Sequence, residues 1–282
     1  MRAADFGRLV ALAAIWGASF LFTRIVAPVL GPVLTADLRM LVAGLALVAY
    51  FRLAGFDPQW RRWGRKYAFV GLLNSGLPFL LFAYAALHLS AGLMAVLNAT
   101  APMWGALLAV LLLGERLTGR RTVGLALGVV GVAVLSRPDA GTTPAFLAIA
   151  ACLAASFLYG LAGVYMKRWA GDVPARGMAV GTQVMGGLLL LPLVPFSAHS
   201  IQADFLVVSS ILALGLVCGA VAYLLYFRLI VDIGPAGALT VTYLIPLFGV
   251  LWGTLFLGEA LSMTMLAGGA LVVLGTVFVL RN

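Results

Sequence analysis

The sequence has few charged residues and few of the residues that build metal sites. Only 10% of its 282 residues are Asp, Glu, Lys or Arg, and it has two cysteines and two histidines. Soluble domains carry about 25% charged residues, so an ordinary soluble domain is excluded. Cys152 and Cys218 lie in apolar runs without metal-ligand neighbours. We expect both to be small packing residues, and we expect no metal site and no cofactor.

What the sequence has in abundance is apolar length. Hydrophobic residues make up 63% of the chain, and the mean hydropathy is +1.12. The apolar runs are too long for the alternating strands of an outer-membrane barrel. We therefore predict an all-α integral membrane protein in the lipid bilayer with ten transmembrane helices, at 6–27, 33–53, 67–87, 91–113, 121–136, 144–166, 175–195, 204–228, 235–257 and 263–280.

The basic residues predict the orientation. The net charge is +9, but the distribution of that charge favours a membrane protein over a nucleic-acid partner. With the N-terminus inside the cell, fifteen of the 18 Lys and Arg residues fall in cytoplasmic segments. This asymmetry follows the positive-inside rule, so we expect both termini to be cytoplasmic.

An internal repeat relates the two halves of the chain. Adding 144 to each number carries residues 97–115 onto 241–259, so that Pro102 falls on Pro246 and Gly114-Glu115 on Gly258-Glu259. At the same offset, Arg39 falls on Gln183 and Phe79 on Tyr223. Each half holds five expected spans, an odd number, so residues 1–138 and 139–282 should insert in opposite directions. Inverted repeats place a binding site near the midplane and support alternating access.

Pro102 and Pro246 are candidate hinges. Each proline removes an intrahelical hydrogen bond and frees the carbonyl four residues earlier, on Asn98 and Thr242. A kink beside a polar residue at matching places in both halves suits a substrate site or a hinge. The alternative is a packing kink that neighbouring helices stabilise.

Polar and aromatic side chains inside the spans are candidates for a substrate cavity. Arg39 could bind a substrate carboxylate, or it could pair with Asp37, a helix carbonyl or a lipid headgroup. Gln183 at the matching position suggests a polar site that both halves need. The other candidates could line a cavity, pack in the core or anchor at the interface: Trp16, Ser19, Tyr84, Asn98, Trp104, Tyr159, Tyr223, Thr242 and Tyr243.

The carboxylates indicate how transport would be driven. Asp37 lies within one turn of the start of its span, and the other eight lie at termini, loops or span ends. Proton-coupled carriers need a titratable relay in the membrane, so we expect uncoupled or gradient-driven transport. We expect no enzyme, because neither a central nucleophile nor a base is present. Glu115 and Glu259 end helices, where an anion is unfavourable, so each should have a basic or backbone-donor partner.

Glycines in the fifth and tenth spans should let helices approach closely. Gly124, Gly128 and Gly131 lie in the fifth span, and Gly268, Gly269 and Gly275 in the tenth. Packing within one chain and dimerisation are both open, so the oligomeric state is expected to be a monomer or a weak dimer.

Three features together resemble a known domain: Trp-Gly-Ala-Ser-Phe at 16–20, the arginine in the second span, and the tract 91–135. They are similar to the EamA domain of the drug/metabolite transporter superfamily, and the second half resembles another copy. The resemblance, which extends to YddG-type aromatic amino acid exporters, implies a bacterial inner-membrane exporter of amino acids or related metabolites. It also implies a cavity lined by spans 1, 3, 4, 6, 8 and 9, with spans 5 and 10 at the periphery. Export of another metabolite or drug with proton coupling is the alternative, and a membrane enzyme is the rival of another class.

Overall fold

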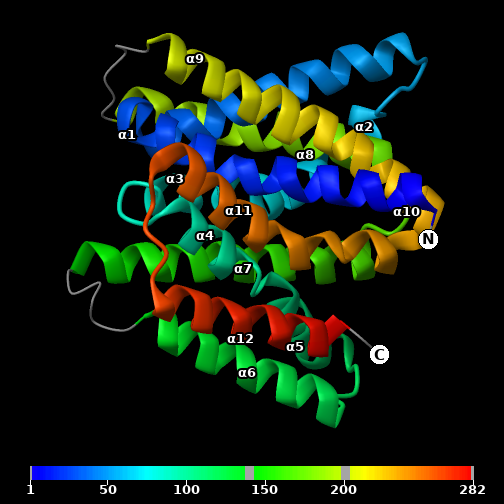
Figure 1. The fold of residues 1–282 in the computed structure, drawn as a ribbon. Helices are drawn as coiled ribbons and strands as arrows, with labels where there is room; N and C mark the ends of the chain where they lie inside the picture. Colours follow the sequence, from blue (N-terminus) through cyan, green and yellow to red (C-terminus); the bar gives the residue numbers. More distant parts are fainter. Residues whose placement is uncertain (1, 137–142, 198–203, 281–282) are drawn as a thin grey trace.

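The computed structural model describes residues 2–136, 143–197 and 204–280, and these residues form helices joined by short turns (Figure 1). The first half contains α1 (Ala3–Leu53), α2 (Trp60–Gly71), the π-helix η1 (Leu72–Gly76), α3 (Leu77–Ala85), α4 (Ala91–Asn98), α5 (Ala101–Leu113) and α6 (Gly119–Leu135). The second contains α7 (Thr143–Trp169), α8 (Ala175–Leu190), the 3-10 helix η3 (Leu191–Phe196), α9 (Phe205–Leu212), the π-helix η4 (Ala213–Val221), α10 (Ala222–Leu239), α11 (Val241–Leu257) and α12 (Met263–Leu280).

Eight of the described helices, counted with their continuous neighbours, are long and apolar enough to cross a membrane. The sequence predicts ten, and the difference has two sources. The element α1 contains both of the first two expected spans in 51 residues. The element α6 is only 17 residues long.

Gly31 divides α1 into two parts. Its φ of 75° and ψ of 161° belong to a region that essentially only glycine adopts. Pro32 follows at once and cannot donate a backbone hydrogen bond. An unbroken helix of 51 residues would be about 75 Å long, far more than one bilayer crossing. Figure 1 shows the chain turning back after the first part of α1, towards the side where it began.

The π-helices η1 and η4 were not expected from the sequence. A shift of 144 residues carries η1 into η4, so the same irregularity occurs at equivalent places in both halves. Segments of this kind arise where an extra residue is accommodated in a helix, and they often occur at functional sites.

The helices α6 and α12 pack against each other at one edge of the bundle (Figure 1). A methyl group added to Gly131 would lie 2.9 Å from the Gly268 carbonyl oxygen, and one added to Gly124 would lie 2.7 Å from the Gly275 carbonyl oxygen. The backbones therefore approach as closely as glycine permits. This confirms the predicted close approach and assigns these glycines to packing within the chain.

Two further glycine contacts join other helices in an equivalent way. A Cβ on Gly17 of α1 would lie 2.7 Å from Phe248 Cβ of α11. A Cβ on Gly160 of α7 would lie 2.6 Å from the Gly105 backbone nitrogen of α5. The first part of α1 is thus fixed to α11, and α7 is fixed to α5. We call these pairs the α1–α11 unit and the α7–α5 unit.

The glutamates that follow α5 and α11 have the kinds of partner that we predicted. Gly114 and Gly258 end their helices in the left-handed conformation, with φ of 69° and 64°. Glu115 pairs with Lys167 at 2.7 Å and Arg121 at 3.0 Å. These two hydrogen-bonded cations hold the pKa of Glu115 below its usual range. Glu259 instead accepts hydrogen bonds from the backbone N–H groups of Ala91 at 2.8 Å and Gly92 at 3.3 Å.

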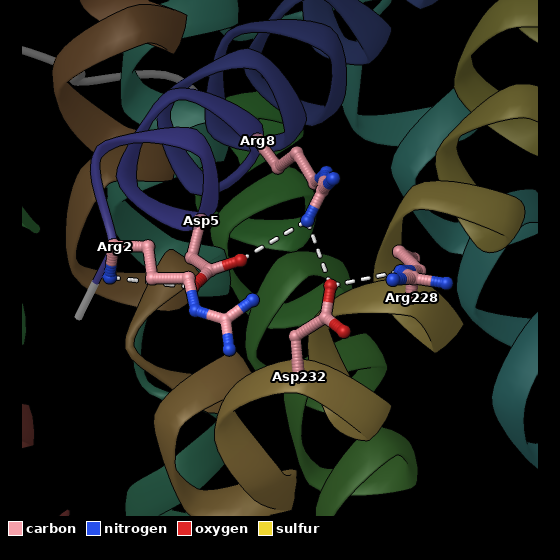
Figure 2. Close-up of polar contacts among 5 residues, drawn as sticks. All are labelled: Arg2, Asp5, Arg8, Arg228 and Asp232. Atoms are coloured by element: carbon pink, nitrogen blue, oxygen red, sulfur yellow. Dashed lines mark hydrogen bonds and ion pairs between the residues drawn. The ribbon is translucent and has the colours of Figure 1, made fainter.

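Ion pairs gather at one end of the bundle, which we call the basic end. Figure 2 shows Arg8 of α1 between Asp5 and Asp232, at 3.0 and 2.7 Å. Asp232 also accepts a hydrogen bond from Arg228, at 2.8 Å. These contacts hold the start of α1 against α10. The first helix begins and the last helix ends on this side of the bundle (Figure 1).

The glycine packing of α6 and α12 gives a stability prediction. We expect Gly131→Ala to lower the free energy of unfolding by about 1–3 kcal/mol, because its methyl group would overlap the Gly268 carbonyl. Gly163→Ala on α7 is the matched control, since a Cβ there meets nothing within 4 Å. The control should be neutral or stabilising by roughly 0.5–1 kcal/mol. Thermal unfolding in detergent measures both variants, and equal stability would contradict the packing.

Candidate functional site

Arg39 lies in the second part of α1 and is only 8% exposed. Its guanidinium carbon stands 3.7 Å from the centre of the Phe79 ring on α3. Among the described residues, Arg39 has neither an ion pair nor a side-chain hydrogen bond. The site therefore contains a buried cation whose described direct interaction is a cation–π contact with the Phe79 ring.

Gln183 of α8, the repeat counterpart of this arginine, is 1% exposed. Its side-chain nitrogen donates to Ser75 Oγ at 3.1 Å and to the Tyr223 hydroxyl at 3.3 Å. The Tyr223 hydroxyl also interacts with the side chain of Asn74. The amide nitrogen of Gln183 is thus satisfied by groups from η1 and α10, and a buried polar group needs such partners.

The repeat explains why these residues meet. Arg39 and Gln183 are 144 residues apart, and so are their partners Phe79 and Tyr223. Each half contributes one long polar side chain and one aromatic ring. Tyr159, Tyr223 and Cys218 lie within electrostatic range of Arg39, which joins the two pairs into one set. We call Arg39, Ser75, Phe79, Tyr159, Gln183 and Tyr223 the central polar layer.

The structural roles considered for Arg39 do not account for its position. Asp37 forms no ion pair with it, and no described backbone carbonyl accepts a hydrogen bond from it. Its burial leaves no access to a lipid headgroup. Asp37 is itself 1% exposed, and its Oδ1 atom has no hydrogen-bond partner. The guanidinium remains a charge that the described residues do not neutralise.

Several other candidate residues lie outside the central polar layer. Trp16 packs on Tyr226 with ring centres 5.4 Å apart, and the Ser19 hydroxyl donates to the Trp16 carbonyl at 2.6 Å. Three more candidates have partners of their own, and no described contact joins them to Arg39. Tyr84 packs on His88, Trp104 packs on Phe157, and the Thr242 hydroxyl donates to the Leu239 carbonyl. Asn98 and Tyr243 are half-buried.

The two candidate hinges differ from each other. Before Pro102 the helix is interrupted, since α4 ends at Asn98 and α5 begins at Ala101. At Pro246 the helix is not interrupted, because α11 runs from Val241 to Leu257. The sequence reading treated the two prolines as equivalent. In the second half, the turn residue Thr240 separates α10 from α11, and the non-helical residue is Gly234 within α10, with φ of 76° and ψ of 165°.

Three residues at this site are not among those that the sequence predicts: Ser75 and Phe79 of the central polar layer, and Asn74, which contacts Tyr223. Phe79 was noticed as the repeat partner of Tyr223 but was not assigned to the site. The signal that could have found it was the repeat itself, because a position equivalent to a candidate aromatic is also a candidate. Ser75 and Asn74 depend on η1, which carries no periodic pattern of its own.

These features define a class: an α-helical protein that crosses the membrane several times and encloses a charged polar layer between two halves. Comparison with known sequences is consistent with a transporter, since the EamA-like transporter family matches residues 8–137 and 146–281. The chain belongs to the EamA-like transporter family.

Curated relatives are named as transporters and exporters. The chain is 28% identical over 207 residues to a probable terminal-alkyne amino-acid exporter of Streptantibioticus cattleyicolor, covering 72% of this chain and 68% of that one. It is 29% identical to the uncharacterized inner membrane transporter YedA of Escherichia coli, covering 91% and 84%. It is also 30% identical to Protein PecM of Dickeya dadantii, covering 90% and 84%.

A solved crystal structure has the same fold. It aligns with a TM-score of 0.68 at 19% identity and covers 99% of this chain and 96% of that chain. At this identity the likeness concerns the fold alone.

The hydrogen bonds of Gln183 predict coupling between their acceptors. Tyr223→Phe or Ser75→Ala alone should cost about 1 kcal/mol, because the amide nitrogen keeps one partner. The double variant leaves it without either acceptor and should cost more than the sum, by at least about 0.5 kcal/mol. Thermal unfolding of the four proteins measures this cycle. Additive losses would show that Gln183 does not join the two groups.

Proposed function

We propose that the protein is a secondary transporter of the bacterial inner membrane that exports amino acids and related small metabolites by alternating access. The observation that carries this proposal is the packing of α4 and α11. These helices touch at the end of the bundle opposite the basic end, whereas α5, which continues α4, does not pack against α11 in the same way. An access path that alternates between two sides requires such a difference between the two ends.

The closed end is built from close contacts. A Cβ added to Gly249 of α11 would meet the Ala95 side chain of α4, and one added to Gly253 would lie 3.5 Å from Ala91 Cβ. The two hydrogen bonds from Ala91 and Gly92 to Glu259 join the same two helices. The end of α11 is therefore fixed to the start of α4.

Among the described residues, the close contact that Gly249 makes has no equivalent at the basic end. Gly105 is the counterpart of Gly249, and a Cβ on it would meet only Gly160 of its own unit within 4 Å. Glu115, the counterpart of Glu259, pairs with Lys167 of α7 and Arg121 of α6, whereas Glu259 joins α11 to α4. The α7–α5 and α1–α11 units thus meet closely at one end only. In the other state of the transport cycle, the basic end would be closed and the end where α4 meets α11 would be open.

Several features support ten spans arranged as two inverted repeats, 1–138 and 139–282. The family matches the chain as two segments of similar length. The π-helices and the left-handed glycine caps recur at the 144-residue offset. The break at Gly31 makes two spans from α1. The contact of α5 with α7 and the contact of α1 with α11 also occupy equivalent positions in the two halves.

The orientation follows from the basic end. The ion pairs of Arg8, Lys66 and Lys167 lie in segments that the sequence assigns to the cytoplasm. The first helix begins and the last ends on that side (Figure 1), so both termini would be cytoplasmic. In this proposed orientation the closed end would face outwards, and the conformation would be an inward-facing one.

Amino acids are the proposed substrates for two reasons. One relative is named as an amino-acid exporter. The central polar layer combines a cation with the rings of Phe79, Tyr159 and Tyr223, and such a layer can hold a polar head and an apolar body. A proton-coupled exporter of another metabolite is the second candidate, because buried Asp37 has an oxygen without a partner.

Counterflow tests the proposed activity. Purified protein in liposomes preloaded with unlabelled amino acid should take up labelled L-phenylalanine or L-leucine with saturation, because one site serves both directions. Uptake should not change when a pH gradient is imposed. Stimulation by the gradient that Asp37→Asn removes would favour the proton-coupled candidate instead. Flux that never saturates would contradict a carrier.

Removing the Glu259 contact should open the outer end. Glu259→Ala deletes two hydrogen bonds to a charged group, which contribute roughly 1.5–3 kcal/mol each at most. We expect the outward-open population to rise about tenfold or more. Spin labels at His88 and Leu261, both exposed, would report longer distances.

Glu115→Ala is the matched control for Glu259→Ala. It removes ion pairs within the basic end and leaves the contact of α4 with α11 in place. An identical distance distribution in wild type and Glu259→Ala would contradict the assignment of this contact as a closure.

A further inference from the structure

We propose that Arg39 binds the carboxylate of the substrate and that the protein is consequently a carboxylate exchanger, whose empty form reorients slowly. This inference rests on the proposed function and specifies the substrate class of its site. It starts from an imbalance, because the central polar layer holds one cation and no described anion paired with it.

The environment of Arg39 does not compensate its charge. A guanidinium taken out of water loses far more solvation than one aromatic face returns. Asp37 is two positions away on the same helix, and side chains at that spacing point to different faces. The other arginine with a defined contact inside the apolar region, Arg24, donates to the Ala86 carbonyl at 2.7 Å. Arg39 has no such acceptor among the described residues.

One neighbouring group can donate a hydrogen bond to an anion. The Tyr223 hydroxyl accepts from Gln183 and also interacts with the side chains of Ser75 and Asn74, so its hydrogen bonds are made within the layer. The Tyr159 hydroxyl makes no hydrogen bond with any described residue and lies within electrostatic range of Arg39. A guanidinium with the free hydroxyl of Tyr159 nearby fits a carboxylate, which arginine binds in a bidentate manner.

The charge of the layer selects a substrate group with a single negative charge, such as the carboxylate of an amino acid. One guanidinium and one carboxylate make a neutral pair, whereas a phosphate dianion would leave a net negative charge between apolar helices. A substrate without an anion would leave Arg39 unpaired. The aromatic rings of Phe79 and Tyr159 then lie next to the anion site, where the apolar part of a carboxylate substrate would be held.

The same argument predicts exchange. When the two units move from the inward-facing to the outward-facing arrangement, the protein must pass through a state in which the central polar layer is closed off at both ends. With a carboxylate bound this state encloses a neutral pair, and without one it encloses a bare cation in a low dielectric. The loaded protein should therefore reorient faster than the empty one.

The binding test uses purified protein and a defined panel of ligands. The panel contains L-phenylalanine, L-leucine, L-lactate, succinate, L-phenylalaninamide and inorganic phosphate, and the readout is the thermal unfolding midpoint as each is titrated. A monocarboxylate should stabilise the wild type, and L-phenylalaninamide should bind at least tenfold more weakly than L-phenylalanine. Arg39→Gln should lose the preference for the acid over the amide. Arg39→Lys should restore part of it, and Arg24→Gln should keep it.

The transport test uses the same proteins in liposomes. An unlabelled monocarboxylate on the far side should accelerate wild-type efflux of the labelled one at least severalfold. Arg39→Gln should show no such acceleration, because its empty form carries no buried charge. The comparison of acid with amide in the wild type remains decisive even where Arg39→Gln fails to fold.

The outcomes separate this inference from the proposed function. Binding of lactate but not of amino acids would support the role of Arg39 and overturn the amino-acid assignment. Equal binding of L-phenylalanine and its amide, with saturable counterflow retained, would overturn the role of Arg39 and leave the transporter standing. Tighter binding of phosphate than of any carboxylate, or no binding across the panel, would also overturn it.

Discussion

The structure depends on two close helix contacts, at Gly17 and Gly160. Each glycine lets a helix touch the backbone of its neighbour, so that α1 is held to α11 and α7 to α5. Helices in lipid gain little from hydrophobic attraction, because the lipid chains are as apolar as their side chains, and close packing of this kind is what holds them together. The two contacts occupy equivalent places in the halves and define two units. The units also meet through α4, which is continued by α5 and packs against α11, and this contact can differ between the two ends of the bundle.

The central polar layer lies where those units face each other. Its polar groups are expensive to bury, and most of them are satisfied, as the hydrogen bonds of Gln183 to Ser75 and Tyr223 show. Arg39 is the charged exception, since its described contact is with the Phe79 ring. A protein that maintains a charge of this kind in its interior gains a site for the opposite charge. In the transport cycle that we propose, the packing asymmetry and the unpaired cation act together, because the units would move around a site that needs an anion.

The sequence predicted the parts of this structure that depend on spacing and local chemistry. The 144-residue offset identified Arg39 and Gln183 as equivalent positions. Because an anion is unfavourable at the C-terminal end of a helix, the sequence also predicted partners for Glu115 and Glu259. It did not predict the contact of Arg39 with Phe79, because that contact depends on how two helices are rotated about their axes. The π-helices have no sequence pattern of their own, and the continuity of α11 through Pro246 is set by its neighbours. Trp104 and Tyr84 could not be separated from the site by sequence, since an aromatic residue in a span looks the same whether it packs or binds.

The most direct test of the account is a reversible lock on the contact that must open. A Cβ on Gly253 would lie 3.5 Å from Ala91 Cβ, which is within the usual range for a disulfide of about 3.5–4.5 Å. The Glu259 carboxylate that covers Gly253 is the end of a flexible side chain and can move aside. We would introduce Ala91→Cys and Gly253→Cys after replacing Cys152 and Cys218, and measure counterflow before and after oxidation. The account predicts that oxidation stops transport and that a reductant restores it. Full transport through the oxidised protein would contradict it, because α4 and α11 would then never need to part.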